Sequence, residues 1–173
     1  MGEDTERKVV VGVSQSLAGL AALRFALDLA HRRSVPLWAV RVWRLEVGPR
    51  AQPSAEWERA IAAEARRYVD DCFRAATGHA VRDLGVIVRT PSGRTDVALH
   101  HYLTDGGDLL VVGAAARRWW SGGTVRRCVR GAGCPVIVVP APDLARTGRF
   151  SARRIAREAA AELSRTGPTR GRP

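Results

Sequence analysis

No run of apolar residues in this 173-residue chain is long enough to cross a membrane. A spanning helix needs about 20 consecutive apolar residues, and the apolar stretches here are all much shorter. The amino-terminal segment MGEDTERK is polar and acidic, unlike the apolar centre of a signal peptide. We therefore predict a cytoplasmic protein without a membrane span.

Cysteine is scarce as well, with three residues in the whole chain. Cys72, Cys128 and Cys134 form no C-x-x-C pair and have no histidine at the spacing of a zinc site. This pattern argues against a disulfide framework. It predicts reduced thiols that pack as small apolar groups.

Recognisable catalytic patterns are also missing. Ser14 and Ser16 follow an apolar run, but no G-x-S-x-G motif surrounds either of them. His100 and His101 are neighbours on an expected helix, so their side chains point about 100° apart and cannot hold a metal by themselves. We predict solvated or capping roles for these histidines, and a protein that is not an enzyme.

Acidic residues are absent or few in two stretches, which makes the charge distribution uneven. The formal net charge is +11, and Lys8 is the only lysine. Residues 113–133 hold five arginines and no acid, and residues 141–173 hold eight arginines against three acids. A genomic base-composition bias explains arginine in place of lysine, but not the missing acids. Such stretches attract an anion, whether a nucleotide, a nucleic acid or an acidic protein surface.

Five short apolar runs predict strands that are buried on both faces. They lie at residues 8–13, 37–43, 84–89, 108–112 and 136–139. Between these runs, apolar residues recur at the helical period over 18–33, 54–77 and 95–103, and again after residue 123. Ser16 is placed to cap the first helix and Gly78 to end the second. We assign Trp38, Trp43 and Trp57 to the core.

The alternation of strands and helices predicts an α/β fold of Rossmann-like type. Short, unpatterned strands indicate a doubly wound five-stranded parallel sheet with helices on both faces. In such folds, ligands bind beyond the carboxyl ends of the strands, at the point where the strand order reverses. Those ends are Gly12–Ser14, Val42–Trp43 and the segment from Gly113 onward. The three segments therefore predict one ligand crevice.

Four segments carry a resemblance to a known family: KVVVGVSQS, LWAVRVW, DLLVVG and GGTVRRCVRGAGCPVIVV. Together they resemble the single-domain members of the universal stress protein family, within the wider adenine-nucleotide α-hydrolase-like fold. The apolar strand ending in glycine and the terminal strand Cys-Pro-Val-Ile-Val-Val are the most specific parts. The resemblance covers about residues 7–142.

Many members of this family bind ATP through Gly-x-x-Gly, a spacer of about nine residues, and a Gly followed by Ser or Thr. The glycines allow close backbone approach, and the last pair opens a helix whose N–H groups hold phosphate. The matching positions here are Gly113, Ala116, Gly122 with Gly123, and Thr124. The spacer between them has only five residues, 117–121.

Two further family positions concern the nucleoside. Ser14 stands where ATP-binding members usually have an aspartate, so a charge-assisted hydrogen bond is replaced by a neutral one. The adenine-contacting position at the end of the second strand maps to Val42, with Val13 on the same side. Arg117 and Arg118 are placed to contact phosphates directly and to compensate for the short loop, with Arg126 or Arg127 nearby.

The resemblance implies a stress-response protein that binds ATP, accompanied by Mg²⁺, or another adenine nucleotide, and that acts through binding and regulation. Any hydrolysis would be weak and incidental. It also implies a homodimer formed through the strand at 136–139. The implied nucleotide-binding residues are Gly12, Val13, Ser14, Val42, Gly113, Ala116, Arg117, Gly122, Gly123 and Thr124.

A second interpretation stays open at this point. The chain can instead be a nucleotide-free interaction module whose arginine-rich loop and tail bind an acidic protein or nucleic acid. Trp119 and Trp120 beside two arginines suit stacking on bases, but two adjacent aromatics do not make a stacking platform. Packing of the loop, or a dimer contact, is the favoured role of these tryptophans.

The chain is expected to divide into three regions. Residues 1–6 are predicted to be disordered, residues 7–142 to form the domain, and residues 143–173 to form a tail rich in arginine and alanine. A helix over 151–164 would present a thin apolar line composed largely of alanine, which buries little area. A docked helix, an interaction helix and a disordered segment are all compatible with this composition.

Overall fold

Five short strands form one parallel sheet in the computed structural model, which describes residues 7–44, 54–114 and 123–142. They are β1 (Val9–Gly12), β2 (Leu37–Val40), β3 (Ile87–Arg89), β4 (Leu109–Ala114) and β5 (Val136–Pro140). The strand order is β3-β2-β1-β4-β5, so the direction of winding reverses between β1 and β4. The predicted doubly wound five-stranded parallel sheet is confirmed.

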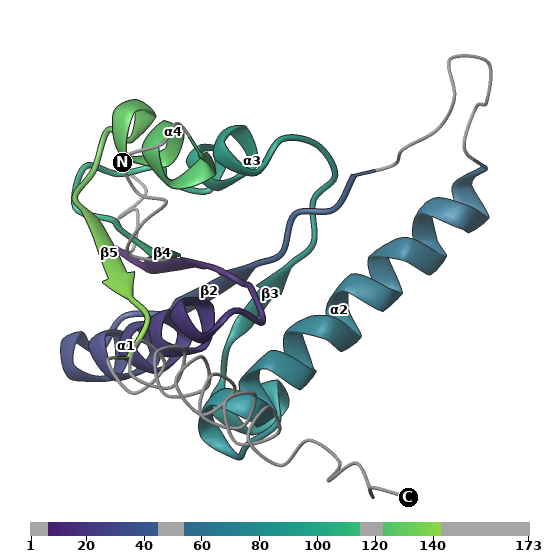
Figure 1. Cartoon of the computed structure of the whole chain (residues 1–173), viewed down its shortest axis with the longest axis horizontal. Coiled ribbons are helices and arrows are strands. Elements are labelled where there is room, and N and C mark those ends of the chain that lie inside the picture. Colours follow the sequence, from purple (N-terminus) through teal and green to yellow (C-terminus); the bar gives the residue numbers. More distant parts are fainter. Residues whose placement is uncertain (1–6, 45–53, 115–122, 143–173) are drawn as a thin grey trace, which may run out of the picture. The chain divides into compact units, whose positions relative to one another are not determined.

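Four α-helices cover the two faces of this sheet. They are α1 (Leu17–Arg33), α2 (Ala55–Thr77), α3 (Thr95–His101) and α4 (Thr124–Gly131). Helices α1 and α2 pack on one face, and α3 and α4 lie together on the other (Figure 1). Alternate strand residues face opposite layers: Val9 and Val11 belong to the α1/α2 core, and Val10 belongs to the α3/α4 core. This is the two-sided burial that unpatterned apolar strands predict.

Local signals in the sequence place several helix ends. The Ser16 hydroxyl accepts a hydrogen bond from the N–H of Gly19 and so caps α1. Gly78 ends α2 with φ of 81°, a left-handed conformation that glycine adopts without strain. Strand β3 begins at Ile87, later than predicted, because a 3₁₀ turn over Val81–Leu84 precedes it.

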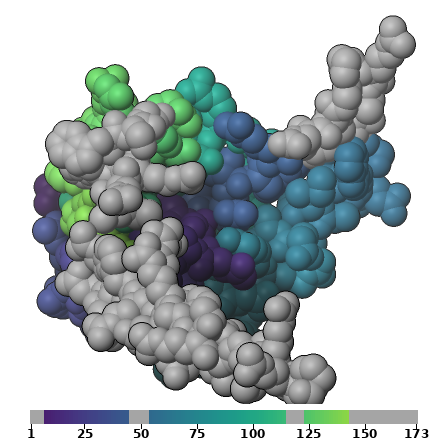
Figure 2. Space-filling view, in the orientation of Figure 1, coloured from purple at the N-terminus to yellow at the C-terminus, as the bar shows by residue number. Residues whose placement is uncertain are grey.

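The first turns of α2 differ from the prediction. Trp57 was expected in the core, but its side chain is 47% exposed, and all residues from 54 to 60 are exposed. The buried residues of α2 begin at Ala65, since only the carboxyl-terminal part of the helix lies over the sheet (Figure 1). In the space-filling view the first turns stand out from the rest of the described surface (Figure 2). The helical repeat of apolar residues in α2 therefore extends beyond the part of the helix that packs on the core.

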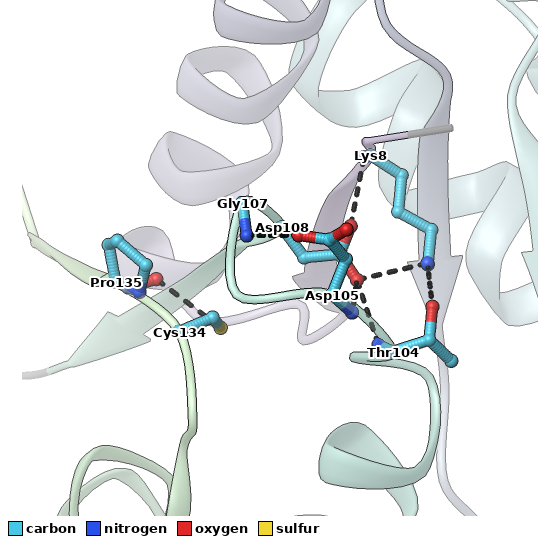
Figure 3. A network of polar contacts seen from close by, with 7 residues as sticks. All are labelled: Lys8, Thr104, Asp105, Gly107, Asp108, Cys134 and Pro135. Atoms are coloured by element: carbon cyan, nitrogen blue, oxygen red, sulfur yellow. Dashed lines mark hydrogen bonds and ion pairs between the residues drawn. The ribbon is translucent and has the colours of Figure 1, made fainter. Parts of the chain in front are cut away.

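A buried polar network connects the two central strands at their amino ends. Lys8 precedes β1 and Asp108 precedes β4, and the Lys8 ammonium lies 3.0 Å from the Asp108 carboxylate (Figure 3). The same carboxylate accepts hydrogen bonds from the N–H groups of Lys8, Thr104 and Asp105. The ammonium also donates to the Thr104 hydroxyl, at 2.7 Å. We call this set the amino-edge network.

The amino-edge network keeps its carboxylate charged although Asp108 is fully buried. Burial raises the pKa of Asp108, but the hydrogen bonds from Lys8, Thr104 and Asp105 outweigh that effect and hold the pKa below its usual value. A buried charge that is paired and fully hydrogen-bonded is tolerated in a protein interior. The network thus fixes β1 against β4 at one end of the sheet.

Two compact units are distinguished along the chain, Met1–Ala141 and Pro142–Pro173. Almost all of the second unit, including the helix expected over 151–164, lies outside the described residues, as do residues 1–6. Among the residues that the structure describes, no helix is both long and apolar enough to span a membrane.

Candidate functional site

The carboxyl ends of β1 and β4 lie side by side at the point where the strand order reverses. Val11 of β1 is in register with Val111 of β4, which places Gly12, Val13 and Gly113 at the same end of the sheet. Val13 is 5% exposed, and its N–H donates to the carbonyl of Val40 in β2. The structure therefore brings these three predicted residues together. We call this region the carboxyl edge.

Gly113 is required here by the packing of α1. A Cβ added to Gly113 would lie 2.4 Å from the carbonyl oxygen of Ala18 and 2.6 Å from the backbone nitrogen of Gly19. Gly19 is equally constrained, because its own Cβ would lie 2.2 Å from the carbonyl oxygen of Ser14. The first turn of α1 thus lies directly on the end of β4, backbone against backbone. This close approach was not anticipated from the sequence, although two glycines in this pattern could have signalled it.

Ser14 shapes the entry into α1. Its hydroxyl oxygen accepts a hydrogen bond from the N–H of Ser16 at 3.2 Å, and the two hydroxyl oxygens are 2.9 Å apart. Ser16 in turn caps the helix through Gly19. The residue that replaces the expected aspartate therefore participates in a local turn in front of the helix.

Arg41 adds a positive charge at the carboxyl edge that was not singled out from the sequence. Its guanidinium donates to the carbonyl of Val13 at 3.3 Å and lies over the Tyr68 ring, 4.0 Å from its centre. The Tyr68 hydroxyl accepts a hydrogen bond from the N–H of Gln15. An arginine inside an otherwise apolar run, LWAVRVW, is the signal that could have identified it.

Val42 lies just beyond β2 and is partly buried against the core on the α3/α4 face. The next residue, Trp43, pairs with Ser92, and its indole N–H donates to the carbonyl of Thr90. These contacts hold the end of β2 beside the segment that leads into α3. Val42 therefore occupies a fixed apolar position beyond the end of β2, but on the opposite face of the sheet from Val13, which packs in the α1/α2 core.

Helix α4 begins with the two residues predicted to hold phosphate. Gly123 is the N-cap residue, is exposed, and contributes no side-chain hydrogen bond to the helix. Thr124 is the first helical residue, and its hydroxyl oxygen accepts a hydrogen bond from the Arg127 guanidinium at 3.3 Å. The N-cap residue of α4 therefore supplies no side chain for the first backbone N–H groups of the helix.

A carboxylate near this helix start pairs with two arginines. Asp96, in the first turn of α3, lies 2.7 Å from the Arg94 guanidinium and 3.4 Å from that of Arg127 in α4. The hydrogen bond from Arg94 lowers the pKa of Asp96, and this effect outweighs its burial. We call these three residues the arginine–aspartate bridge. Neither Arg94 nor Asp96 was identified from the sequence, because Asp96 and Arg127 are 31 positions apart along the chain.

His100 takes a structural role between α3 and α4. His100 donates from Nε2 to the carbonyl oxygen of Cys128 in the last turn of α4, at 2.9 Å. A Cβ on Gly131 would lie 2.5 Å from this imidazole ring, so α3 and α4 pack closely there. The predicted capping role is confirmed for this residue. Within the described ranges, no three His, Cys, Asp or Glu side chains gather in a way that could hold a metal ion.

Several predicted site residues lie outside the described residues. These are Ala116, Arg117 and Gly122 of the predicted phosphate loop, together with the neighbouring Arg118, Trp119 and Trp120.

The sequence profile of the Universal stress protein family matches residues 6–140. The chain therefore belongs to the universal stress protein family. The resemblance that four short segments indicated is confirmed over most of the chain. No curated protein sequence matches this universal stress protein family member.

Solved universal stress proteins have the same fold. One from Burkholderia pseudomallei is 23% identical with a TM-score of 0.54, over 81% of this chain and 100% of that one. One from Lactobacillus plantarum is 21% identical with a TM-score of 0.51, over 78% and 97% of the two chains. A universal stress protein in complex with cAMP is 19% identical with a TM-score of 0.51, over 79% and 98%.

Proposed function

We propose that this chain binds an adenine nucleotide at the carboxyl edge and acts in the stress response through binding. ATP with Mg²⁺ is the form proposed first. Val13 and Val42 are proposed to contact the adenine, with Gly12 and Ser14 beside the sugar. The phosphates are assigned to Gly113, Ala116, Arg117, Gly122, Gly123 and Thr124.

The observation that carries this proposal is the start of α4. Gly123 leaves the first N–H groups of the helix without a side-chain cap, and the helix dipole favours an anion at that end. Thr124 adds a hydroxyl, and Arg127 lies beside it. The stretch 113–133 carries five arginines and no acid, so the local field attracts phosphate.

The family and one solved relative support the adenine part of the proposal. A universal stress protein of the same fold was crystallised with cAMP, which is an adenine nucleotide. In this chain the apolar residues Val13 and Val42 follow the neighbouring strands β1 and β2 but pack on opposite faces of the sheet, so we propose that the base lies across the carboxyl edge between them. Ser14 offers a hydroxyl rather than a carboxylate to the sugar, which predicts weaker binding than an aspartate would give.

Binding rather than catalysis is proposed because of the state of Asp96, the carboxylate paired with Arg127. A general base works best with a pKa near the working pH. Asp96 has a lowered pKa and is held by two arginines, so it is a poor proton acceptor at neutral pH. Mg²⁺ would be carried chiefly by the nucleotide's own phosphates.

The test is calorimetric titration of the purified chain with ATP and Mg²⁺ at moderate salt. Measurable heat at ATP concentrations up to about 1 mM, corresponding to about 4 kcal/mol of binding free energy, is the expected result. No heat under these conditions would overturn the nucleotide proposal. In that case, a mobility-shift assay with DNA and RNA across salt concentrations tests the interaction-module alternative, because phosphate-driven binding weakens steeply with salt.

The variant Gly123→Asp separates a binding role of the helix start from a purely structural one. A Cβ at position 123 meets nothing within 4 Å, and the backbone there is extended, as an N-cap requires. The new carboxylate caps α4 and raises stability by about 1 kcal/mol, yet it places a negative charge where phosphate is proposed to bind. We expect a higher melting temperature and loss of ATP binding, whereas Gly123→Asn should retain part of the binding. Unchanged ATP affinity in Gly123→Asp would contradict the assignment.

We also propose that the chain forms a homodimer through β5. This strand is at an edge of the sheet, and the four apolar residues of 136–139 are only partly buried. An unpaired apolar edge favours pairing with a second chain. Sedimentation should show a dimer that Val138→Lys dissociates, while Ile87→Lys on the opposite edge strand leaves it intact. A monomer at all concentrations would overturn this proposal.

A cytoplasmic location is part of the same proposal. Cys72, Cys128 and Cys134 are all free, and burial raises the pKa of Cys72 and of Cys128 to about 11. Thiols of this kind suit a reducing compartment.

A further inference from the structure

The arginine–aspartate bridge connects the starts of α3 and α4, which both follow strands of the sheet. Asp96 is 5% exposed, whereas the side chains of Arg94 and Arg127 are 60% and 44% exposed. One buried carboxylate thus holds two arginines that reach solvent. The bridge as a whole carries one net positive charge.

Burying this carboxylate is not needed to pack α3 on the sheet. Leu99 and Ala98, from the same helix, are themselves buried and supply apolar contact. Burial of an ion pair stabilises a fold little, because desolvation offsets the attraction. Its better-supported effect is to fix the geometry of the charged groups. Asp96 is therefore expected to hold one of its charged partners in place.

Arg127 is the partner whose position matters for the proposed ligand. It lies one turn after Thr124 on α4, and its Nη2 donates to the Thr124 hydroxyl at 3.3 Å. Its Nε lies 3.4 Å from the Asp96 carboxylate across the helix pair. Side chains on a helix lean toward its amino end, so this guanidinium is directed back toward the opening of α4. A planar guanidinium can contact a carboxylate along one edge and a phosphate along another.

We propose that Asp96 is a positioning residue that holds Arg127 beside Thr124, so that this guanidinium contacts the phosphates of the bound nucleotide. The proposal rests on nucleotide binding at the carboxyl edge. Arg94 supplies the second positive charge that keeps Asp96 ionised when the site is empty. The base and sugar contacts do not involve the bridge.

This proposal and simple electrostatics predict opposite signs for one variant. Asp96→Asn removes a negative charge near the phosphates, so charge alone would tighten ATP binding. If Asp96 positions Arg127, the same variant loses the ion pair that holds the guanidinium and weakens binding. We expect the ATP affinity of Asp96→Asn to fall about tenfold, the usual size of one lost hydrogen bond to a charged group.

The experiment is calorimetric titration of four full-length proteins with ATP: wild type, Asp96→Asn, Arg127→Lys and the double variant. Arg127→Lys keeps the charge but loses the planar fork, and it should bind about as weakly as Asp96→Asn. In the double variant, Asp96→Asn should have no further effect, since the residue acts through Arg127. Adenosine, without phosphate, should bind all four proteins equally. Asp83→Asn, which removes an exposed aspartate outside the bridge, is the charge-matched control.

The outcomes separate the two proposals. If wild-type protein binds no adenine nucleotide, nucleotide binding itself is refuted and the positioning role falls with it. If wild type binds ATP but Asp96→Asn binds equally or more tightly, only the positioning role is overturned. Additive losses in the double variant would overturn it as well, because they would mean that the residues act independently. Urea unfolding of each variant tests whether the fold is retained. If Asp96→Asn is unstable, Arg127→Lys still tests the proposal, because Arg127 is half exposed.

Discussion

A buried aspartate in each of two networks pairs with basic side chains, Asp108 with Lys8 and Asp96 with two arginines, and the two arrangements differ in where the positive charge lies. In the amino-edge network, Asp108 and Lys8 are both buried, and the ion pair is closed to solvent. In the arginine–aspartate bridge, Asp96 is buried but its partners are largely exposed. Both carboxylates have lowered pKa values. The same pairing chemistry therefore fastens strands in one network and presents positive charge in the other.

The largest expected difference between the two networks concerns stability. Asp108→Ala leaves a buried ammonium and three N–H groups without their acceptor, which should lower the free energy of unfolding by about 3–5 kcal/mol. Asp96→Ala should cost only about 1 kcal/mol, since its arginines remain solvated. Urea unfolding of both variants tests this contrast. Asp108→Asn, which keeps one acceptor oxygen, should lie between them, and equal losses in the two alanine variants would contradict the contrast.

Substitutions at Gly113 and Gly123, two glycines of the phosphate motif, should also differ in how much stability they cost. Gly113→Ala places a Cβ 2.4 Å from the backbone of α1, and overpacking of this kind costs about 1–3 kcal/mol. Gly123→Ala meets nothing within 4 Å and should cost less than about 1 kcal/mol. Thermal unfolding followed by circular dichroism measures both. If Gly113→Ala proves as mild as Gly123→Ala, the close approach of α1 to β4 is wrong.

Acid should weaken the amino-edge network and so lower the stability of the fold. The pKa of Asp108 is lower in the folded chain than its unfolded value of about 3.9, so the unfolded state binds more protons as the pH falls. The stability from this group is fully present above that value and is lost as the pH falls through the folded pKa. Urea midpoints measured between about pH 6 and pH 2 should fall less steeply for Asp108→Asn than for wild type. Parallel pH profiles would show that Asp108 does not contribute.

The smallest expected effect concerns Ser14, which is proposed to lie beside the sugar at the carboxyl edge. Ser14→Asp introduces the carboxylate that ATP-binding relatives usually have, and it can still accept the N–H of Ser16. We expect about threefold tighter ATP binding, because a charged acceptor hydrogen-bonds more strongly than a hydroxyl. Calorimetry against Ser14→Asn, a neutral acceptor of the same size, isolates the charge. Weaker binding in Ser14→Asp would mean that its charge repels the phosphates.

Much of the fold was predictable because its signals are local. Apolar runs identified all five strands, and Ser16 and Gly78 marked helix ends through hydrogen bonds or backbone angles of neighbouring residues. The exposure of Trp57 was not predictable, since periodicity shows which face of a helix is apolar but not where the sheet beneath it ends. Some residues of the candidate site were predictable from the sequence, and others were not. Glycines and a threonine followed from a family pattern, whereas Arg41 gained its partners only through folding.

The sequence alone determined the alternation of strands and helices, the parallel sheet and the family, because periodicity and short motifs depend on residues that are close along the chain. Only the tertiary structure decided that Gly113 lies against the backbone of α1 and that Asp96 joins Arg94 to Arg127. The contacts of Gly113 with α1 and of Asp96 with Arg127 connect residues from different elements, and their strength depends on burial and distance. Neither quantity can be read from composition or spacing, since packing of the elements sets both.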